Sequence, residues 1–325
     1  MDNYLSQIPS ETLQHLLTSV RCHSWPFSTD IPLFDNHIPL NRGDVIEIQG
    51  HASCGKSHFL YHFLLSCILP PPPSRGMSAI LYDTDSSFDI LRFCHLLSTR
   101  ISELFPLVDA GKHAELKQTS LSLLHIFRPK SLPQLATSLK YLLSYHASHI
   151  PDDEIGLLAI DSMSAFYWPE LLYEEQLRNF APKKTGGKET LHRVLTAISD
   201  IIRSHAPLVL LTNWGLRTVS QEQSTRYPST LYKQHLRQFP VVQDVTSTVQ
   251  PLRLAHHVSL SLPSLAPLHP NSRHDVSGEK LPYERDDIAS GCRVVCLITS
   301  SGVQEMSRFQ LIINGDHIQT SEIES

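Results

Sequence analysis

The amino-acid sequence predicts an α/β protein with a mainly parallel central sheet, helices on both faces of that sheet, and an antiparallel extension at its C-terminal end. Short apolar runs alternate with longer helical stretches from Asp44 to Trp214. This alternation is typical of parallel strands, because strands buried on both faces are apolar and need long crossover connections. After Trp214, three apolar runs follow one another without helical stretches between them, which predicts the antiparallel extension.

The parallel part contains five predicted strands and four predicted helices. The strands are the apolar runs at 45–48, 79–83, 123–127, 157–161 and 208–213. The helices are the stretches at 56–69, 88–101, 132–147 and 188–204. Each connection between these strands is long enough for a right-handed crossover. The later strands are predicted within "LRLAHHVSLSL", "CRVVCLITS" and "RFQLIING".

One core domain is predicted over residues 44–325. Residues 1–43 mix polar residues with isolated apolar ones, so we expect a leader that packs on the core without a separate folded domain. A Ser-, Pro- and His-rich span at about 263–291 is predicted as an irregular insertion. The chain shows neither a signal sequence nor a bilayer-spanning apolar run, which predicts an intracellular protein.

Charge, cysteines and histidines exclude several kinds of function. A formal net charge of -5 excludes a polycation that binds DNA over its whole surface, so any DNA contact must be local. The 6 cysteines lack the paired spacing of a zinc site and are expected to be reduced thiols. The 19 histidines form no HExxH motif, and we predict no metal site from them.

A phosphate-binding loop is predicted at Gly50-His51-Ala52-Ser53-Cys54-Gly55-Lys56-Ser57, between the first strand and the first helix. In this setting the backbone N–H groups of G-x-x-x-x-G-K-S surround an anion, reinforced by the helix N-terminus. We expect Lys56 to reach the β- and γ-phosphates of a nucleotide and the Ser57 hydroxyl to hold Mg²⁺. Cys54 contributes its backbone here and is expected to be an inert thiol. The alternative is a strand-to-helix turn that no longer binds nucleotide.

Carboxylates end two further predicted strands. Asp161 ends the strand in "LLAIDSMSAFYW", where a phosphate-loop enzyme places the carboxylate that orders the water shell of Mg²⁺. Capping of the next turn is the alternative for Asp161. Asp83 and Asp85 follow the strand in "AILYDTDSSFDILRF", and either could meet a hydrolytic water. For each of these two, capping of the following helix is the more ordinary role.

The segments GHASCGKS, LYDTDSSFDILRF, LLAIDSMSAFYW and LVLLTN, in this order and spacing, resemble the core of RecA-type recombinases and especially the eukaryotic recombinase paralogues. The resemblance covers residues 44–214 well and the C-terminal strands more loosely. It implies a RecA-like core that binds ATP at Lys56 and Ser57, with Asp161 at the metal. It also implies a nuclear subunit of a paralogue complex that supports recombinase filament assembly in homologous recombination repair of DNA double-strand breaks.

The chain departs from a full recombinase in the residues that position water and link protomers. Where the recombinase positions the attacking water with Glu, this chain has Asp85, which is shorter by about 1.5 Å. Where the recombinase has Asn-Gln, with the Gln sensing the γ-phosphate, this chain has Asn213-Trp214, and an indole cannot accept a hydrogen bond. The segment FSTD at 27–30 lacks the Ala of the Phe-x-x-Ala segment that docks one recombinase protomer on the next. We therefore expect weak or absent hydrolysis and a terminal subunit that does not self-polymerise.

The loops after Asp161 and Asn213 are the DNA-facing loops that the same resemblance implies. Their basic residues, interleaved with Tyr, could track the backbone of single-stranded DNA. These candidates are Lys183, Lys184, Lys188, Arg217, Arg226, Lys233 and Arg237. Glutamates in the same loops dilute the positive charge, and an ordinary solvated loop is the alternative.

Three functions are compatible with these residues. The first is a non-polymerising ATP-binding subunit of a recombinase-paralogue complex, which accounts for the motif order together with the departures. The second is an active DNA-dependent ATPase with strand-exchange activity. The third, a small-molecule kinase, needs a lid with clustered arginines, and the AFYW context and the late antiparallel strands argue against it.

Overall fold

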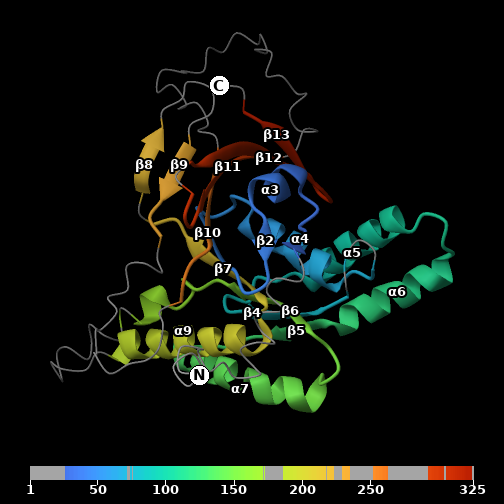
Figure 1. The fold of residues 1–325 in the computed structure, drawn as a ribbon, viewed down its shortest axis with the longest axis horizontal. Helices are drawn as coiled ribbons and strands as arrows, with labels where there is room; N and C mark the ends of the chain where they lie inside the picture. The colour runs from blue at the N-terminus through green and yellow to red at the C-terminus, as the bar shows by residue number, and fades with distance from the viewer. Residues whose placement is uncertain are drawn as a thin grey trace, which may run out of the picture.

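A computed structural model describes residues 26–71, 74, 76–170, 172, 186–216, 218–222, 229–234, 252–262, 292–303 and 305–323. A nine-stranded sheet in the order β13-β12-β11-β10-β3-β7-β6-β4-β5 forms its centre. Strands β10 to β5 in this order are parallel, and β10 to β13 are antiparallel. The predicted fold class is confirmed, and the arrangement is RecA-like (Figure 1).

The parallel part contains the five predicted strands. They are β3 Val45–Gly50, β4 Ser78–Asp83, β5 Leu124–Phe127, β6 Ile155–Asp161 and β7 Leu208–Trp214. All residues of β3, β4 and β6 are buried. This burial is expected of parallel strands whose two faces are both covered.

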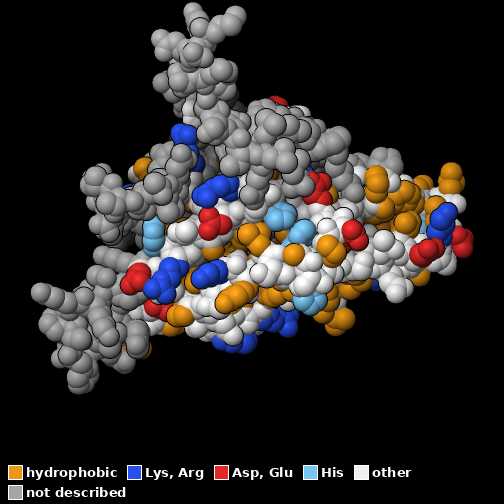
Figure 2. Space-filling view, turned by 60° about the horizontal axis from the view of Figure 1, so that its bottom comes forward, with side chains coloured by type: hydrophobic (Ala, Val, Ile, Leu, Met, Phe, Trp, Pro, Cys, Tyr) orange, Lys and Arg blue, Asp and Glu red, His pale blue; other side chains and the backbone are white. Residues whose placement is uncertain are grey.

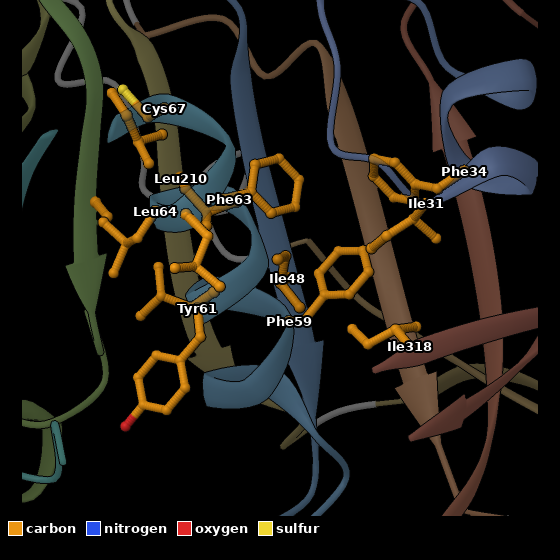
Figure 3. Close-up of a cluster of buried hydrophobic side chains, with 14 of the residues drawn as sticks. Ile31, Phe34, Ile48, Phe59, Tyr61, Phe63, Leu64, Cys67, Leu210 and Ile318 are labelled. Carbon is orange, nitrogen blue, oxygen red and sulfur yellow. The ribbon is translucent and has the colours of Figure 1, made fainter. Parts of the chain in front are cut away.

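Helices cover both faces of the parallel part (Figure 1). The predicted helices are α4 Lys56–Ile68, α5 Ile90–Leu104, α7 Leu132–His149 and α9 Gly186–His205. One core joins α4, α5 and the short α3 Pro32–His37 to the sheet, and a second core joins α7 and α9 to the opposite face. In the first core, Phe59 of α4 lies edge-on to Phe34, with ring centroids 5.1 Å apart (Figure 3). These contacts fix the helix that begins at the phosphate loop.

The antiparallel extension consists of four strands, of which the sequence predicted three. They are β10 His256–Ser261, β11 Cys292–Ser300, β12 Ser307–Ile313 and β13 Ile318–Glu322. Strand β10 belongs to both parts, because it pairs parallel to β3 and antiparallel to β11. The sequence did not predict β13, in which Ile318 is the buried residue.

Other elements were also missing from the prediction. Helix α6 Ala110–Ser122 is polar and shows no apolar stripe in its sequence, and Ser120 is its only buried residue. A separate hairpin of β8 Thr218–Glu222 and β9 Ser229–Tyr232 follows β7, where a loop was expected.

The described N-terminal residues pack on the core. Strands β1 Pro26–Phe27 and β2 Leu40–Asn41 form a two-stranded sheet, and the Phe27 ring stacks on Phe63 of α4 at 6.0 Å. Residues 1–25 and 263–291 lie outside the described residues, so the predicted domain division stays a prediction. Within the described ranges, the helices are too short or too polar to cross a bilayer.

Candidate nucleotide site

The predicted phosphate loop forms a tight turn between β3 and α4, at the carboxyl edge of the parallel strands. Gly55 caps α4 with φ +88°, in the left-handed region that glycine adopts without strain. A Cβ at Gly50 would lie 2.3 Å from the Cys54 Sγ and 2.6 Å from the Leu260 carbonyl oxygen. Gly55 is therefore required by the turn, and Gly50 by the close approach of Cys54 and of Leu260 in β10.

The Lys56 side chain folds back on the loop. Its Nζ donates to the carbonyl oxygens of Gly50 at 2.8 Å and of His51 at 2.7 Å. These acceptors are neutral, so they hold the ammonium group beside the turn without neutralising its charge. A phosphate entering the turn would meet this cation and the helix N-terminus together.

Ser57 and Asp161 meet at the same edge, although they come from different parts of the chain. The Ser57 hydroxyl donates to Asp161 Oδ2 at 3.1 Å, and the Thr212 hydroxyl of β7 donates to Oδ1. Burial raises the pKa of Asp161, the Thr212 hydrogen bond opposes that rise, and the charge of Asp85 adds to it. A hydroxyl and a carboxylate in contact are the oxygen groups that Mg²⁺ uses beside a bound nucleotide.

The two carboxylates that follow β4 have different surroundings. Asp83 is buried, pairs with the Arg128 guanidinium at 2.9 Å and accepts the Ser87 N–H at 3.0 Å. Asp85 is exposed and accepts the same N–H at 3.1 Å. Because Asp83 is held in a structural ion pair, Asp85 is the better candidate for contact with a hydrolytic water.

The capping role expected for Asp83 and Asp85 is wrong. Helix α5 begins at Ile90, and its N-cap is Asp89, whose side chain accepts the N–H groups of Leu91 and Arg92. The phosphate-loop helix supports this start, because the Asp89 N–H donates to the Tyr61 hydroxyl of α4 at 3.0 Å.

The end of β7 carries one buried and one exposed side chain. Asn213 is buried, and its Nδ2 donates to Glu47 Oε1 of β3 at 2.8 Å. Trp214 is 38% exposed, and its backbone N–H donates to the Ser164 hydroxyl at 2.9 Å. Asn213 thus links two neighbouring strands, while the indole offers a single donor at the position where a recombinase has Gln.

Two further residues contact the phosphate loop and were not singled out from the sequence. The Gly215 N–H donates to the Gly50 carbonyl oxygen at 3.1 Å. The Tyr232 ring of β9 lies edge-on to the His51 ring, with centroids 5.5 Å apart. A glycine directly after a buried strand is a signal for close approach, whereas nothing in the local sequence marks Tyr232.

Cys54 lies inside the turn and is fully buried. Burial raises the pKa of its thiol, and the nearby Lys56 charge opposes that rise only in part. The neutral thiol is a poor nucleophile. A packing role for Cys54 follows, since its sulfur fills the space above Gly50.

The candidate DNA contacts lie largely outside the described residues. Lys183, Lys184, Arg217, Arg226 and Arg237 fall there, and the structure does not describe the side chain of Lys188. Lys233 is exposed just after β9. Exposed aromatic rings lie where the two candidate loops begin: Tyr167 and Trp168 follow β6, and Trp214 ends β7. On the face in Figure 2, basic and acidic side chains are interspersed.

Ligands for a metal are few in the described part of the chain. No group of three or more His, Cys, Asp or Glu there could hold a metal ion. Bound Mg²⁺ would therefore need the phosphates of a nucleotide in addition to Ser57 and Asp161.

Comparison with known proteins supports the resemblance seen in the motifs. The chain is similar to the mouse protein named DNA repair protein XRCC2, with 31% identity over 130 residues, covering 39% of this chain and 42% of that protein. It is also similar to the Arabidopsis thaliana protein named DNA repair protein XRCC2 homolog, with 25% identity over 208 residues, covering 54% and 56%. The chain thus spans about half the length of the curated relatives it matches. No family model matches the chain. The predicted resemblance to a RecA-type recombinase paralogue is confirmed.

Proposed function

We propose that this chain is a non-polymerising, ATP-binding subunit of a recombinase-paralogue complex. The complex acts in the nucleus, in homologous recombination repair of DNA double-strand breaks, and supports assembly of the recombinase filament. The names of the two relatives place those proteins in DNA repair. The order of the four motifs and the RecA-like sheet support the same role for this chain.

The contact between Ser57 and Asp161 carries the ATP-binding part of the proposal. The 3.1 Å hydrogen bond joins the end of the phosphate loop to the end of β6. Lys56 is bonded to neutral carbonyl oxygens, so turning toward a phosphate breaks no bond to a charged partner. Lys56 would hold the β- and γ-phosphates of ATP, and Ser57 and Asp161 would hold Mg²⁺. Bound ATP supplies a phosphoanhydride that water can cleave.

Hydrolysis is expected to be weak because Asp85 and Trp214 are poorly suited to position the attacking water and to sense the γ-phosphate. The exposed Asp85 is bonded within its own turn, and Trp214 offers no acceptor. A misplaced general base forfeits about 10²-fold to 10⁴-fold in rate. The bound nucleotide would then act as a structural or switching ligand.

The packing of Phe27 supports a terminal position in the assembly. In a recombinase, the Phe of the Phe-x-x-Ala segment would be expected to dock on a neighbouring protomer. Here the Phe27 ring stacks on Phe63 of its own chain at 6.0 Å and is 9% exposed. Because the Phe27 ring is already buried against its own chain, it is not available to dock on a second copy. We therefore infer that partners are other paralogues, with single-stranded DNA a further partner of the loops after Asp161 and Asn213.

The first experiment measures equilibrium binding of ATP-Mg²⁺ and phosphate release with single-stranded DNA. Lys56→Ala should weaken binding about 30-fold or more, because it removes a charge-assisted contact of about 2 kcal/mol or more. Lys140→Ala, at an exposed lysine of α7, is the matched control and should bind normally. Little phosphate release is expected from the wild type.

Two results would change the proposal. DNA-stimulated release that disappears in Lys56→Ala would replace it with the DNA-dependent ATPase. Absence of binding in the wild type would leave the loop as a structural turn. The terminal position is tested separately by sedimentation with ATP and single-stranded DNA, where long homopolymers would contradict it.

A further inference from the structure

Arg128, Lys130 and Ser131 lie together in the segment that joins β5 to α7. Residues 128–131 form neither helix nor strand, and the side chains of Arg128 and Lys130 are exposed, while Pro129 between them is buried and anchors the segment. Ser131 is partly exposed and has an extended backbone, with φ -156° and ψ 161°. A hydroxyl in an extended surface segment is accessible to an enzyme that must bind the chain around it.

The Ser131 hydroxyl acts as an acceptor at the start of α7. It accepts the Gln134 N–H at 3.3 Å, and Gln134 Oε1 accepts the Lys130 N–H at 2.6 Å in return. Within the described part of the chain, no acceptor receives a hydrogen bond from the Ser131 hydroxyl. An ester at this oxygen therefore breaks no bond that its proton makes, and a phosphate ester still offers acceptors to the Gln134 N–H.

Two basic side chains reach from this segment toward the loop that carries Asp85. Arg128 Nε pairs with Asp83 at 2.9 Å, and Lys130 Nζ donates to the Ser86 hydroxyl at 3.2 Å. The partner of Lys130 is neutral, and an ammonium group binds a hydroxyl more weakly than it binds a phosphate. Among the described residues, the terminal amino groups of Arg128 have no acceptor. Both side chains therefore have capacity for a new anion.

Arg128 also places a recognition signal beside the hydroxyl, because it stands three residues before Ser131. Kinases choose substrates by charge pattern, and an arginine at this spacing suits those that select basic residues. The acceptor with the same spacing at Ser24 lies outside the described residues. Four other described acceptors with this spacing are buried or lie within a helix or strand: Ser78, Ser229, Thr196 and Ser220.

We propose that Ser131 is a phosphorylation site whose phosphate recruits Lys130 from Ser86. A protein kinase that selects basic residues would transfer the γ-phosphoryl group of ATP to Ser131. The bond from Oγ to phosphorus forms, the bond from that phosphorus to ADP breaks, and the hydroxyl proton passes to the kinase. The product carries about two negative charges beside Arg128 and Lys130. Because this dianion is a stronger partner than a hydroxyl, Lys130 leaves Ser86, and residues 84–89 lose one of their ties.

The modification would regulate the loop that carries Asp85 without acting on the phosphate loop. Asp83 still accepts the N–H groups of Ser87 and Phe88, so residues 84–89 are loosened and not released. The change does not depend on ATP binding by this chain, because both the phosphate content of Ser131 and the mobility of the loop can be measured without bound nucleotide.

Mass spectrometry of the full chain locates the phosphate after incubation with ATP and a purified arginine-directed protein kinase. Hydrogen exchange is then measured after the kinase and the nucleotide are removed. Residues 84–89 should exchange about 5-fold faster in the phosphorylated chain than in the unmodified chain, the lower end of ordinary coupling between sites. Lys130→Gln removes the same tie without a phosphate, so its unmodified loop should show a similar acceleration.

Ser131→Asn is the matched control, because asparagine caps a helix about as well as serine but cannot be phosphorylated. After the same treatment it retains any phosphate at other positions, and its loop should exchange like that of the unmodified wild type. Absence of phosphate at Ser131, an unchanged loop in the phosphorylated chain, or an equal acceleration in Ser131→Asn would overturn the inference. Each of these results would leave the proposed ATP binding untouched.

Discussion

In the proposed nucleotide site, the carboxylate proposed to hold Mg²⁺ (the metal side) and the carboxylate proposed to meet the hydrolytic water (the water side) are held differently. Asp161 is buried and accepts hydroxyl hydrogen bonds on both oxygens, from Ser57 of α4 and Thr212 of β7. Asp85 is exposed and accepts a backbone N–H from its own turn. Support from two separate elements keeps a side chain in place before a ligand arrives, whereas a residue on one turn must be ordered by the ligand. Binding and hydrolysis of a nucleotide can therefore be separated within one fold.

The largest expected effect comes from restoring, at positions 85 and 214, the residues that a recombinase has. Asp85→Glu combined with Trp214→Gln restores the reach and the acceptor that the chain lacks, so phosphate release with single-stranded DNA should rise by about 10-fold or more. ATP affinity should stay within about 3-fold of the wild type, because the metal side is unchanged. Steady-state kinetics beside equilibrium binding separates the two quantities.

The single variants are the controls for this gain. Each restores only one group, and the two groups serve the same hydrolytic step, so each alone should give less than the double variant. If the double variant binds ATP normally and releases no more phosphate than the wild type, the two positions do not explain weak hydrolysis.

The sequence predicted the positions of Ser57 and Asp161 better than their surroundings, for physical reasons. Strands β3, β6 and β7 are mainly apolar and parallel, so the residues that follow β3 and end β6 meet at one edge of the sheet, where Ser57 and Asp161 lie. Helix α6 has a polar surface and was missed for that reason. The contact of Tyr232 with His51 joins segments far apart in the chain, and no local pattern records such a meeting.

Acid should lower the stability of the protein through two histidines of α4, the helix that begins at the phosphate loop. Burial lowers the pKa of His58 to about 4 and of His62 to about 3, with the Arg92 charge as a further cause for His58. Both values lie below the ordinary 6.5. The fold therefore favours the neutral rings, and their contribution to stability is complete above pH 6.5 and is lost as the pH falls toward these values.

Thermal unfolding between pH 7 and pH 5 measures this loss. Each histidine should remove about 1 kcal/mol of unfolding free energy per pH unit below 6.5. His62→Gln should show a shallower decline, whereas His95→Gln, at an exposed histidine beside Asp316, should decline like the wild type. An equally steep decline in His62→Gln would show that other groups cause the acid sensitivity.

The smallest expected effect comes from Asp161→Asn, which tests the proposed metal ligand. This change should raise the stability of the fold and remove the effect of Mg²⁺ on ATP binding. Because burial raises the pKa of Asp161, its contribution to stability is complete below the ordinary pKa and is lost as the pH rises through the raised value. The ionised carboxylate is therefore a cost at neutral pH. Asp161→Asn should raise the melting temperature by about 2–4 °C, which corresponds to about 1 kcal/mol, while Mg²⁺ should no longer strengthen ATP binding. Ser57→Ala is the control, since it should also weaken the Mg²⁺ effect but removes no charge and should not raise the melting temperature. A variant Asp161→Asn that melts lower and keeps its Mg²⁺ dependence would assign the carboxylate to structure and leave the metal without its main protein ligand.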